Sequence, residues 1–137
     1  MVLYAAADAP LPEIAETDPP GVFSARRIDT DEDVVRAHLT KPHVYFLGSY
    51  TGCSCGFSFG VGGDEDADGR VSVEALGTYI VAAVARAGAI QLYACWDGDE
   101  AEPAEQTETV TTDAFDGDAE AFDLPERWLA TVSSPAS

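Results

Sequence analysis

The chain has 137 residues, and its 25 Asp and Glu oppose only seven Lys and Arg, which leaves a formal net charge of −18. Such a field repels nucleic-acid phosphates and anionic membranes, so we expect neither as a partner, whereas a basic protein would be a suitable one. With 46% hydrophobic residues, this length predicts a single domain over residues 1–132 and a flexible tail at 133–137.

Targeting signals and cysteine usage point to a reducing compartment. No apolar run approaches the roughly 20 residues that a membrane span requires. The N-terminus lacks both the basic region and the long apolar region of a signal peptide, so we expect a cytoplasmic protein. Three cysteines cannot all pair within one chain, so free thiols or metal ligands are expected instead of a disulfide framework.

Apolar and proline-rich stretches divide the first part of the chain. Residues 2–6 and 22–28 are predicted as strands, separated by a loop at 8–21 that is rich in Pro, Asp and Glu. A short helix is predicted over 30–41, where apolar residues recur at helical spacing until a proline follows. The nearly continuous apolar run at 43–49 is typical of a central strand buried on both faces.

The middle of the chain predicts one more strand and the main helix. Residues 53–60 alternate in polarity with period two, which indicates a half-buried strand, and the turn at 50–52 could close a hairpin before it. The helix is predicted over 72–87, with Ser72 as its N-cap and Gly88 just after its end.

An acidic segment follows the strand predicted at 90–96. Between Asp97 and Asp123 the sequence has eleven acidic residues and no Lys, Arg or His. Short exposed strands are predicted at 107–112 and 127–132. Together, these elements predict a compact α/β domain with a mixed sheet of about four to six strands and two helices that lie mainly on one face.

The run Gly52-Cys53-Ser54-Cys55-Gly56 directly follows the predicted central strand and is the strongest candidate for a functional site. Glycines on both sides allow a tight turn or a close approach to another group. Cys53 and Cys55 would be the primary metal ligands or nucleophiles, and Cys95 and Asp97 could complete the site. Thiolate ligands of this kind suit a soft metal such as zinc.

The alternative packs the same cysteines into the core, since buried free cysteine is common and inert. The course of the strand at 90–96 distinguishes the two readings. If it runs parallel to 43–49, Cys95 ends near the turn that carries Cys53. If it runs parallel to 53–60, Cys95 lies at the opposite end of the sheet. The second arrangement is the simpler right-handed crossover and favours the alternative.

Two further motifs match known sites only in part. The glycine-rich run fits the Gly-x-Ser-x-Gly pattern of a serine nucleophile, but no histidine follows Ser54 and no helix is predicted directly after it. Asp64, Asp66 and Asp68 have the spacing of the first ligands of a calcium loop, but position twelve is Ala75 and not a glutamate. A solvated acidic turn before a helix is the favoured interpretation of that segment.

Four stretches together resemble a family of small uncharacterised prokaryotic proteins. They are the opening run from Ala6 to Pro12, the run from Lys41 to Ser49, the run from Gly52 to Phe57 and the later run from Cys95 to Glu100. Members of that family have a similar Gly-Cys-x-Cys-Gly-Phe stretch and a later Cys-Trp-Asp-Gly stretch. The resemblance implies no activity, substrate or cofactor.

Two functional classes are therefore expected. The first is a small binding or regulatory module that uses the Cys-x-Cys turn as a thiol or metal site. The second is an interaction domain without catalytic activity, which presents its acidic segment to a basic protein while its cysteines pack inside. A thiol enzyme is a weaker option, because no histidine is obviously placed to act as its base.

Overall fold

The computed structural model describes most of the chain. The described residues are 1–15, 21, 23–28, 30–50, 54–58, 67–96, 98–115 and 123–134. At 30–33, 55 and 67 it describes the backbone alone. No helix within these ranges is long and apolar enough to cross a membrane.

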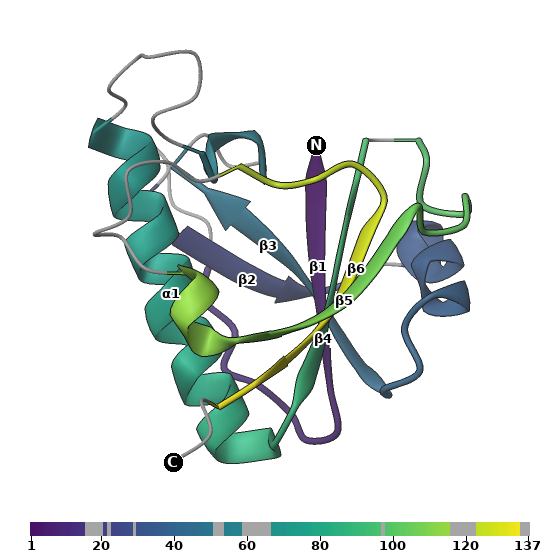
Figure 1. Cartoon of the computed structure of the whole chain (residues 1–137), viewed down its shortest axis with the longest axis horizontal. Coiled ribbons are helices and arrows are strands. Elements are labelled where there is room, and N and C mark those ends of the chain that lie inside the picture. Colours follow the sequence, from purple (N-terminus) through teal and green to yellow (C-terminus); the bar gives the residue numbers. More distant parts are fainter. Residues whose placement is uncertain are drawn as a thin grey trace.

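Six strands form one mixed sheet (Figure 1). In chain order they are β1 (Val2–Ala7), β2 (Phe23–Arg27), β3 (His43–Ser49), β4 (Ile90–Cys95), β5 (Gln106–Thr111) and β6 (Trp128–Ser133). Their order across the sheet is β2-β3-β1-β4-β6-β5. Only β5 and β6 are parallel, and the other neighbours are antiparallel. The predicted α/β class and mixed sheet are confirmed.

The long helix α1 (Ala67–Ala87) covers one face of the sheet. Its apolar stripe includes Val73, Leu76 and Ile80, each of which is fully buried. These side chains pack on the inward residues of five strands, from Ala25 of β2 to Val132 of β6. Strand residues of this set occur at every second position, because successive side chains in a strand point to opposite faces. The result is one continuous core under α1.

The opposite face is covered by a much shorter element. The segment predicted as a first helix is a 3-10 helix, η1 (Thr30–Ala37). Val35 of η1 and Leu39, which lies just after η1, pack against β1, β3 and β4 in a separate, smaller core. Figure 1 shows α1 and η1 on either side of the sheet. The structure therefore has one α-helix where two were predicted, and the shorter helical element lies on the other face.

The start of α1 differs from the prediction. Ser72 is not an N-cap, because the helix already begins at Ala67 and Ser72 is fully buried within it. Its hydroxyl accepts a hydrogen bond from the backbone N–H of Tyr50 at 3.0 Å, which ties the helix to the end of β3. The helix was predicted to begin too late because Asp68 and Gly69, in its first turn, have low helix propensity.

Residues 54–58 do not form the predicted strand. Ser54–Gly56 is a single 3-10 turn, η2, and Phe57 is buried in the core under α1. The backbone N–H of Gly56 donates to the Ser49 hydroxyl at 3.0 Å, so the chain folds back over the end of β3. A β-carbon at Gly56 would lie 2.7 Å from the Tyr50 ring, so only glycine fits this close approach. The hairpin predicted at 50–52 involves residues 51 and 52, outside the described residues.

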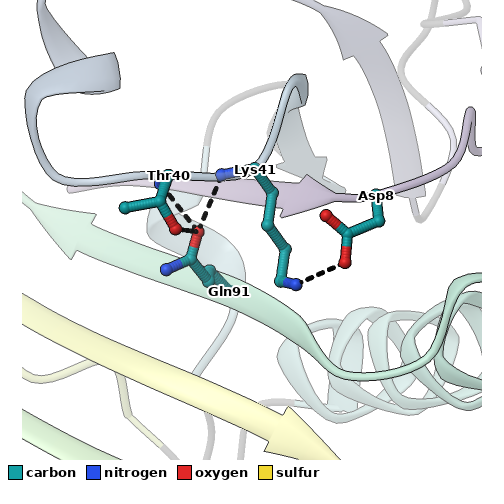
Figure 2. A network of polar contacts seen from close by, with 4 residues as sticks. All are labelled: Asp8, Thr40, Lys41 and Gln91. Carbon is teal, nitrogen blue, oxygen red and sulfur yellow. Dashed lines mark hydrogen bonds and ion pairs between the residues drawn. The ribbon is translucent and has the colours of Figure 1, made fainter.

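A network of polar contacts fastens the loop between η1 and β3 (Figure 2). The Gln91 carbonyl oxygen on β4 accepts hydrogen bonds from the N–H groups of Thr40 and Lys41, at 2.9 and 3.2 Å, and from the Thr40 hydroxyl. Lys41, the sole lysine of the chain, forms an ion pair with Asp8 at 2.7 Å. Together these contacts join the loop after η1 to β4 and to the residue that follows β1.

The bounds of the remaining strands agree with the prediction to within two residues, but β6 is not the exposed strand that was predicted, because it lies between β4 and β5 and buries Trp128, Ala130 and Val132. The strand predicted at 43–49 has those bounds, and the later ones lie at Gln106–Thr111 and Trp128–Ser133. β6 extends one residue beyond the predicted domain end at 132. Most of the predicted tail, 135–137, lies outside the described residues, so its flexibility stays a prediction.

Candidate functional site

A cavity of about 250 Å³ lies at the end of the sheet where β3 and β4 end and β1 and β6 begin. Its walls come from four separate stretches of the chain, and the lining residues are Met1, Ser54, Phe57, Trp96, Asp123, Leu124 and Glu126. Ser54 is the central residue of the glycine-rich motif, so the cavity borders the segment that the sequence singled out.

Ser54 holds the floor of this cavity in place. Its hydroxyl donates to the carbonyl of Leu47 at 2.6 Å and accepts from the N–H of Leu3 at 2.8 Å. Leu3 and Leu47 are register partners on β1 and β3, so the hydroxyl is inserted between two neighbouring strands at the end of their ladder. With both roles of the hydroxyl taken up and the side chain 1% exposed, Ser54 is a structural residue, not a nucleophile.

Apolar side chains form the walls. Phe57 and Leu124 are buried and belong to the core under α1. Trp96 follows the last residue of β4 and is 51% exposed, although tryptophan is usually well buried. A large aromatic side chain left half open beside a cavity offers a ligand a flat face with a negative quadrupole.

Two carboxylates complete the lining. Asp123 and Glu126 are both exposed, and they flank the buried Leu124 in the segment that leads into β6. The Asp123 carboxylate accepts the N–H of Leu124 at 2.9 Å, which fixes the start of this turn. The cavity therefore combines apolar walls, one aromatic face and negative charge.

The predicted cysteine site is only partly described. The crossover favoured from the sequence is wrong, because β4 runs parallel to β3 with β1 between them, and Cys95 therefore lies at the same end of the sheet as Ser49. However, Cys95 is fully buried in the smaller core under η1, whereas Ser54 and Phe57 lie on the α1 side. Cys53 and the side chain of Cys55 lie outside the described residues. A site built on these two thiols therefore stays a prediction.

The other predicted ligands are similarly divided. Asp97, Asp64 and Asp66 lie outside the described residues. Asp68 is exposed in the first turn of α1, where a calcium loop would need a bend at the next residue. Over the parts of the chain that the structure describes, no three His, Cys, Asp or Glu side chains are grouped so that they could hold a metal ion.

Ser54 and Phe57 were indicated by the glycine-rich run and Trp96 by the end of a predicted strand, but the sequence did not predict that they line one cavity with two carboxylates. The tryptophan after a strand and the glycine-rich turn after another strand were visible signals. Asp123 is the last residue of the acidic stretch and Glu126 lies beyond it, and neither was predicted as a site residue. Their position beside the cavity follows from the pairing of β6 with β4, which brings Trp128 opposite Ala94.

Comparison of the chain with protein-family models, with curated proteins and with solved structures found no match in any of the three.

Proposed function

We propose that this protein is a small binding module whose site is the cavity beside Ser54, and that its ligand is a small organic cation with an apolar part. The observation that carries this proposal is the half-exposed Trp96, which shares one cavity with two carboxylates and the apolar side chains of Met1, Phe57 and Leu124. A cation over an aromatic face gains about 0.5–2 kcal/mol, and the carboxylates add attraction of the same sign.

The charge of the whole chain supports this ligand class. A net charge of −18 raises the local concentration of cations and repels anions. The cavity volume of about 250 Å³ lies just below the roughly 300–1,000 Å³ typical of drug-sized ligands. A single ammonium group that carries one ring or a short alkyl chain would suit it.

Tryptophan fluorescence tests the proposal directly. Trp96 is exposed and Trp128 is 5% exposed, so a ligand in the cavity should change the emission of Trp96 in particular. We expect saturable binding of benzyltrimethylammonium and none of benzoate, which has a similar ring and the opposite charge. Glu126→Gln should weaken binding by about threefold or more, since it removes one nearby charge.

A matched control separates the local charge from the overall field. Glu74 is exposed on α1, so Glu74→Gln removes the same charge from a helix face that does not line the cavity. We expect the control to bind like the unmodified protein. Equal loss in both variants, or equal binding of benzoate, would contradict the proposal.

The thiols give this proposal a finer form. Cys53 and Cys55 flank Ser54 in the sequence, and in this finer form their thiols bind a soft metal or act as nucleophiles. Elemental analysis after purification without chelator tests the metal role: stoichiometric zinc that is lost in a Cys53→Ser/Cys55→Ser variant would support it. Zinc retained by that variant would argue against it.

A second function is favoured by the edge strand β5. Residues Gln106–Thr109 are all exposed, and Glu102, Glu105 and Asp113 around them are exposed acids. A basic extended segment of another protein could pair with this edge and neutralise its charge. Amide shifts upon addition of a Lys-rich peptide should then concentrate on β5. Shifts confined to the cavity would instead support the first proposal.

A further inference from the structure

A second cavity, of about 290 Å³, lies at the β2 edge of the sheet. Its lining includes Glu13, Ile14, Ser24, Arg26 and Phe46. On β2, Phe23 and Ala25 point into the core under α1, so Ser24 and Arg26 point to the other face. This cavity is therefore on the η1 side of the sheet and is separate from the site beside Ser54.

Two backbone features create this space. Ser24 is the register partner of Gly48 on β3, and a glycine leaves no side chain to fill the position beside it. Ile14 pairs with Ala25 through two backbone hydrogen bonds of 2.8 and 2.9 Å. This bridge holds residues 13–15 against the outer edge of β2 and forms one wall.

The Ser24 hydroxyl is the feature that points to a ligand. Ser24 is only 8% exposed and lines the cavity. Within the described part of the chain its hydroxyl makes no hydrogen bond. The hydroxyl is not among the described side-chain atoms that are fully buried without a partner, so it is open to the cavity and to water there. A polar group of a bound molecule would replace that water.

Charges of both signs share the same cavity. The Arg26 guanidinium lies over the Phe46 ring, 4.6 Å from its centroid, and its Nη1 donates to the carbonyl of Arg27 at 3.4 Å. The Glu13 carboxylate accepts the N–H of Arg27 at 3.1 Å and is thereby held at the wall. Ile14, which is 39% exposed, adds apolar surface between them.

We infer that this cavity binds a small zwitterion of the α-amino-acid class with an apolar side chain. Its carboxylate would accept hydrogen bonds from Arg26 and the Ser24 hydroxyl, and its ammonium group would pair with Glu13. Its side chain would pack on Phe46 and Ile14. Because such a ligand has no net charge, the strongly negative field of the protein does not repel it.

Titration of the unmodified protein with three ligands tests this inference without depending on any variant. L-Leucine carries both charges, 4-methylpentanoate lacks the ammonium group and isoamylamine lacks the carboxylate. Amide chemical shifts should show leucine binding at residues 13–15 and 24–26, at least tenfold tighter than either analogue. Equal binding of all three, or no shifts in these segments, would overturn the inference.

Variants assign the contacts. Ser24→Ala and Glu13→Gln should each weaken leucine binding about three- to tenfold, as expected for one hydrogen bond or one charge contact. Ser58→Ala and Glu74→Gln make the same chemical changes outside this cavity and should leave binding unchanged. An unaltered affinity in Ser24→Ala would also overturn the inference. The cation site beside Ser54 can fail its own test without affecting this one.

Discussion

The two faces of the sheet differ in how they are closed. Under α1, a helix of 21 residues seals one core that reaches from β2 to β6. Under η1, a 3-10 helix of eight residues covers only the central strands. The sheet therefore has an extensive hydrophobic core on the α1 side and a smaller one on the η1 side. Stability is concentrated under α1, which leaves the η1 side free to keep a cavity and open surface.

Residues of β5 and β6 show this difference within two neighbouring strands. Val110 and Val132 are register partners, and both pack toward α1. Thr109 and Thr131, the pair just before them, point to the other face, where Thr109 is exposed. Alternation with period two thus separates an apolar pair that faces α1 from a pair of hydroxyl side chains on the other face.

The largest expected effect compares one core residue from each face. Ile80→Ala should lower the free energy of unfolding by about 3–5 kcal/mol, because the rigid surroundings under α1 would retain a cavity. Leu39→Ala should cost less, about 2–3 kcal/mol, since η1 can settle toward the sheet. Urea denaturation of both variants checks this order. A larger loss for Leu39→Ala would break the comparison.

Gly77 tests how tightly the α1 face is packed. A β-carbon there would collide with the backbone carbonyl of Phe115, which ends η4 (Thr112–Phe115). Gly77→Ala should therefore destabilise the protein by about 2–3 kcal/mol, even though alanine favours helices. Thr78→Ala, at an exposed neighbouring position, is the control and should change stability by less than about 0.5 kcal/mol. A stabilised Gly77→Ala would show that η4 moves away freely.

Ser54 tests the strand junction at the cavity. Ser54→Ala should cost about 1–3 kcal/mol, because it leaves the N–H of Leu3 without a buried partner. Ser58→Ala, at a less buried serine in the same segment, should stay within about 0.5 kcal/mol. Thermal unfolding of both variants provides the measurement. Equal melting temperatures would mean that water replaces the hydroxyl.

Tyr93 and Tyr79, on the two faces of the sheet, should both affect stability at alkaline pH. Burial, with a smaller effect of Cys95, raises the pKa of Tyr93 on the η1 side from 10.0 to about 12. Burial also raises the pKa of Tyr79 on α1, and Tyr45 and Glu13 add to this shift. The folded chain holds these phenol protons more tightly than the unfolded chain. The resulting stability is fully present below pH 10 and is lost as the pH rises through 12.

A variant isolates the contribution of Tyr93. Its hydroxyl donates to the carbonyl of Glu102 at 2.8 Å, so Tyr93→Phe should cost about 1 kcal/mol at neutral pH. The same variant should lose less stability between pH 10 and 12 than the unmodified protein. Urea denaturation at several pH values measures both effects. An unchanged slope with pH would show that Tyr93 does not contribute to alkaline unfolding.

Much of the sheet was predictable because local patterns and tertiary structure agree there. The apolar run at 43–49 and the strand at Ile90–Cys95 follow directly from burial on both faces. The segment around Ser54 was predicted wrongly, because its alternating residues fit a strand while its side chains bond to β1 and β3. The hydrogen bond between Leu3 and Ser54 joins residues 51 positions apart in the sequence, so no local pattern predicts it.

The cavities were less predictable than the strands. Trp96 lines a cavity and is half exposed, whereas an aromatic residue at the end of a predicted central strand is more often part of the core. The Ser24 cavity depends on a register pairing with Gly48 and on the bridge between Ile14 and Ala25. Neither is visible in composition or periodicity, because both are set by how distant segments meet.

The Gln91 contacts fasten the end of the η1 segment to the sheet, in addition to the Lys41–Asp8 ion pair and the packing of Val35 and Leu39. One side-chain oxygen receives three hydrogen bonds from residues 40 and 41, so breaking them would make opening of η1 easier while the backbone ladders of the sheet stay intact. Amide protons of residues 35–39 should then exchange as one cooperative unit, faster than those of α1. The Cys95 thiol, sealed beneath this unit, should react with a thiol reagent only as often as the unit opens. Gln91→Ala should therefore accelerate both processes by the same factor.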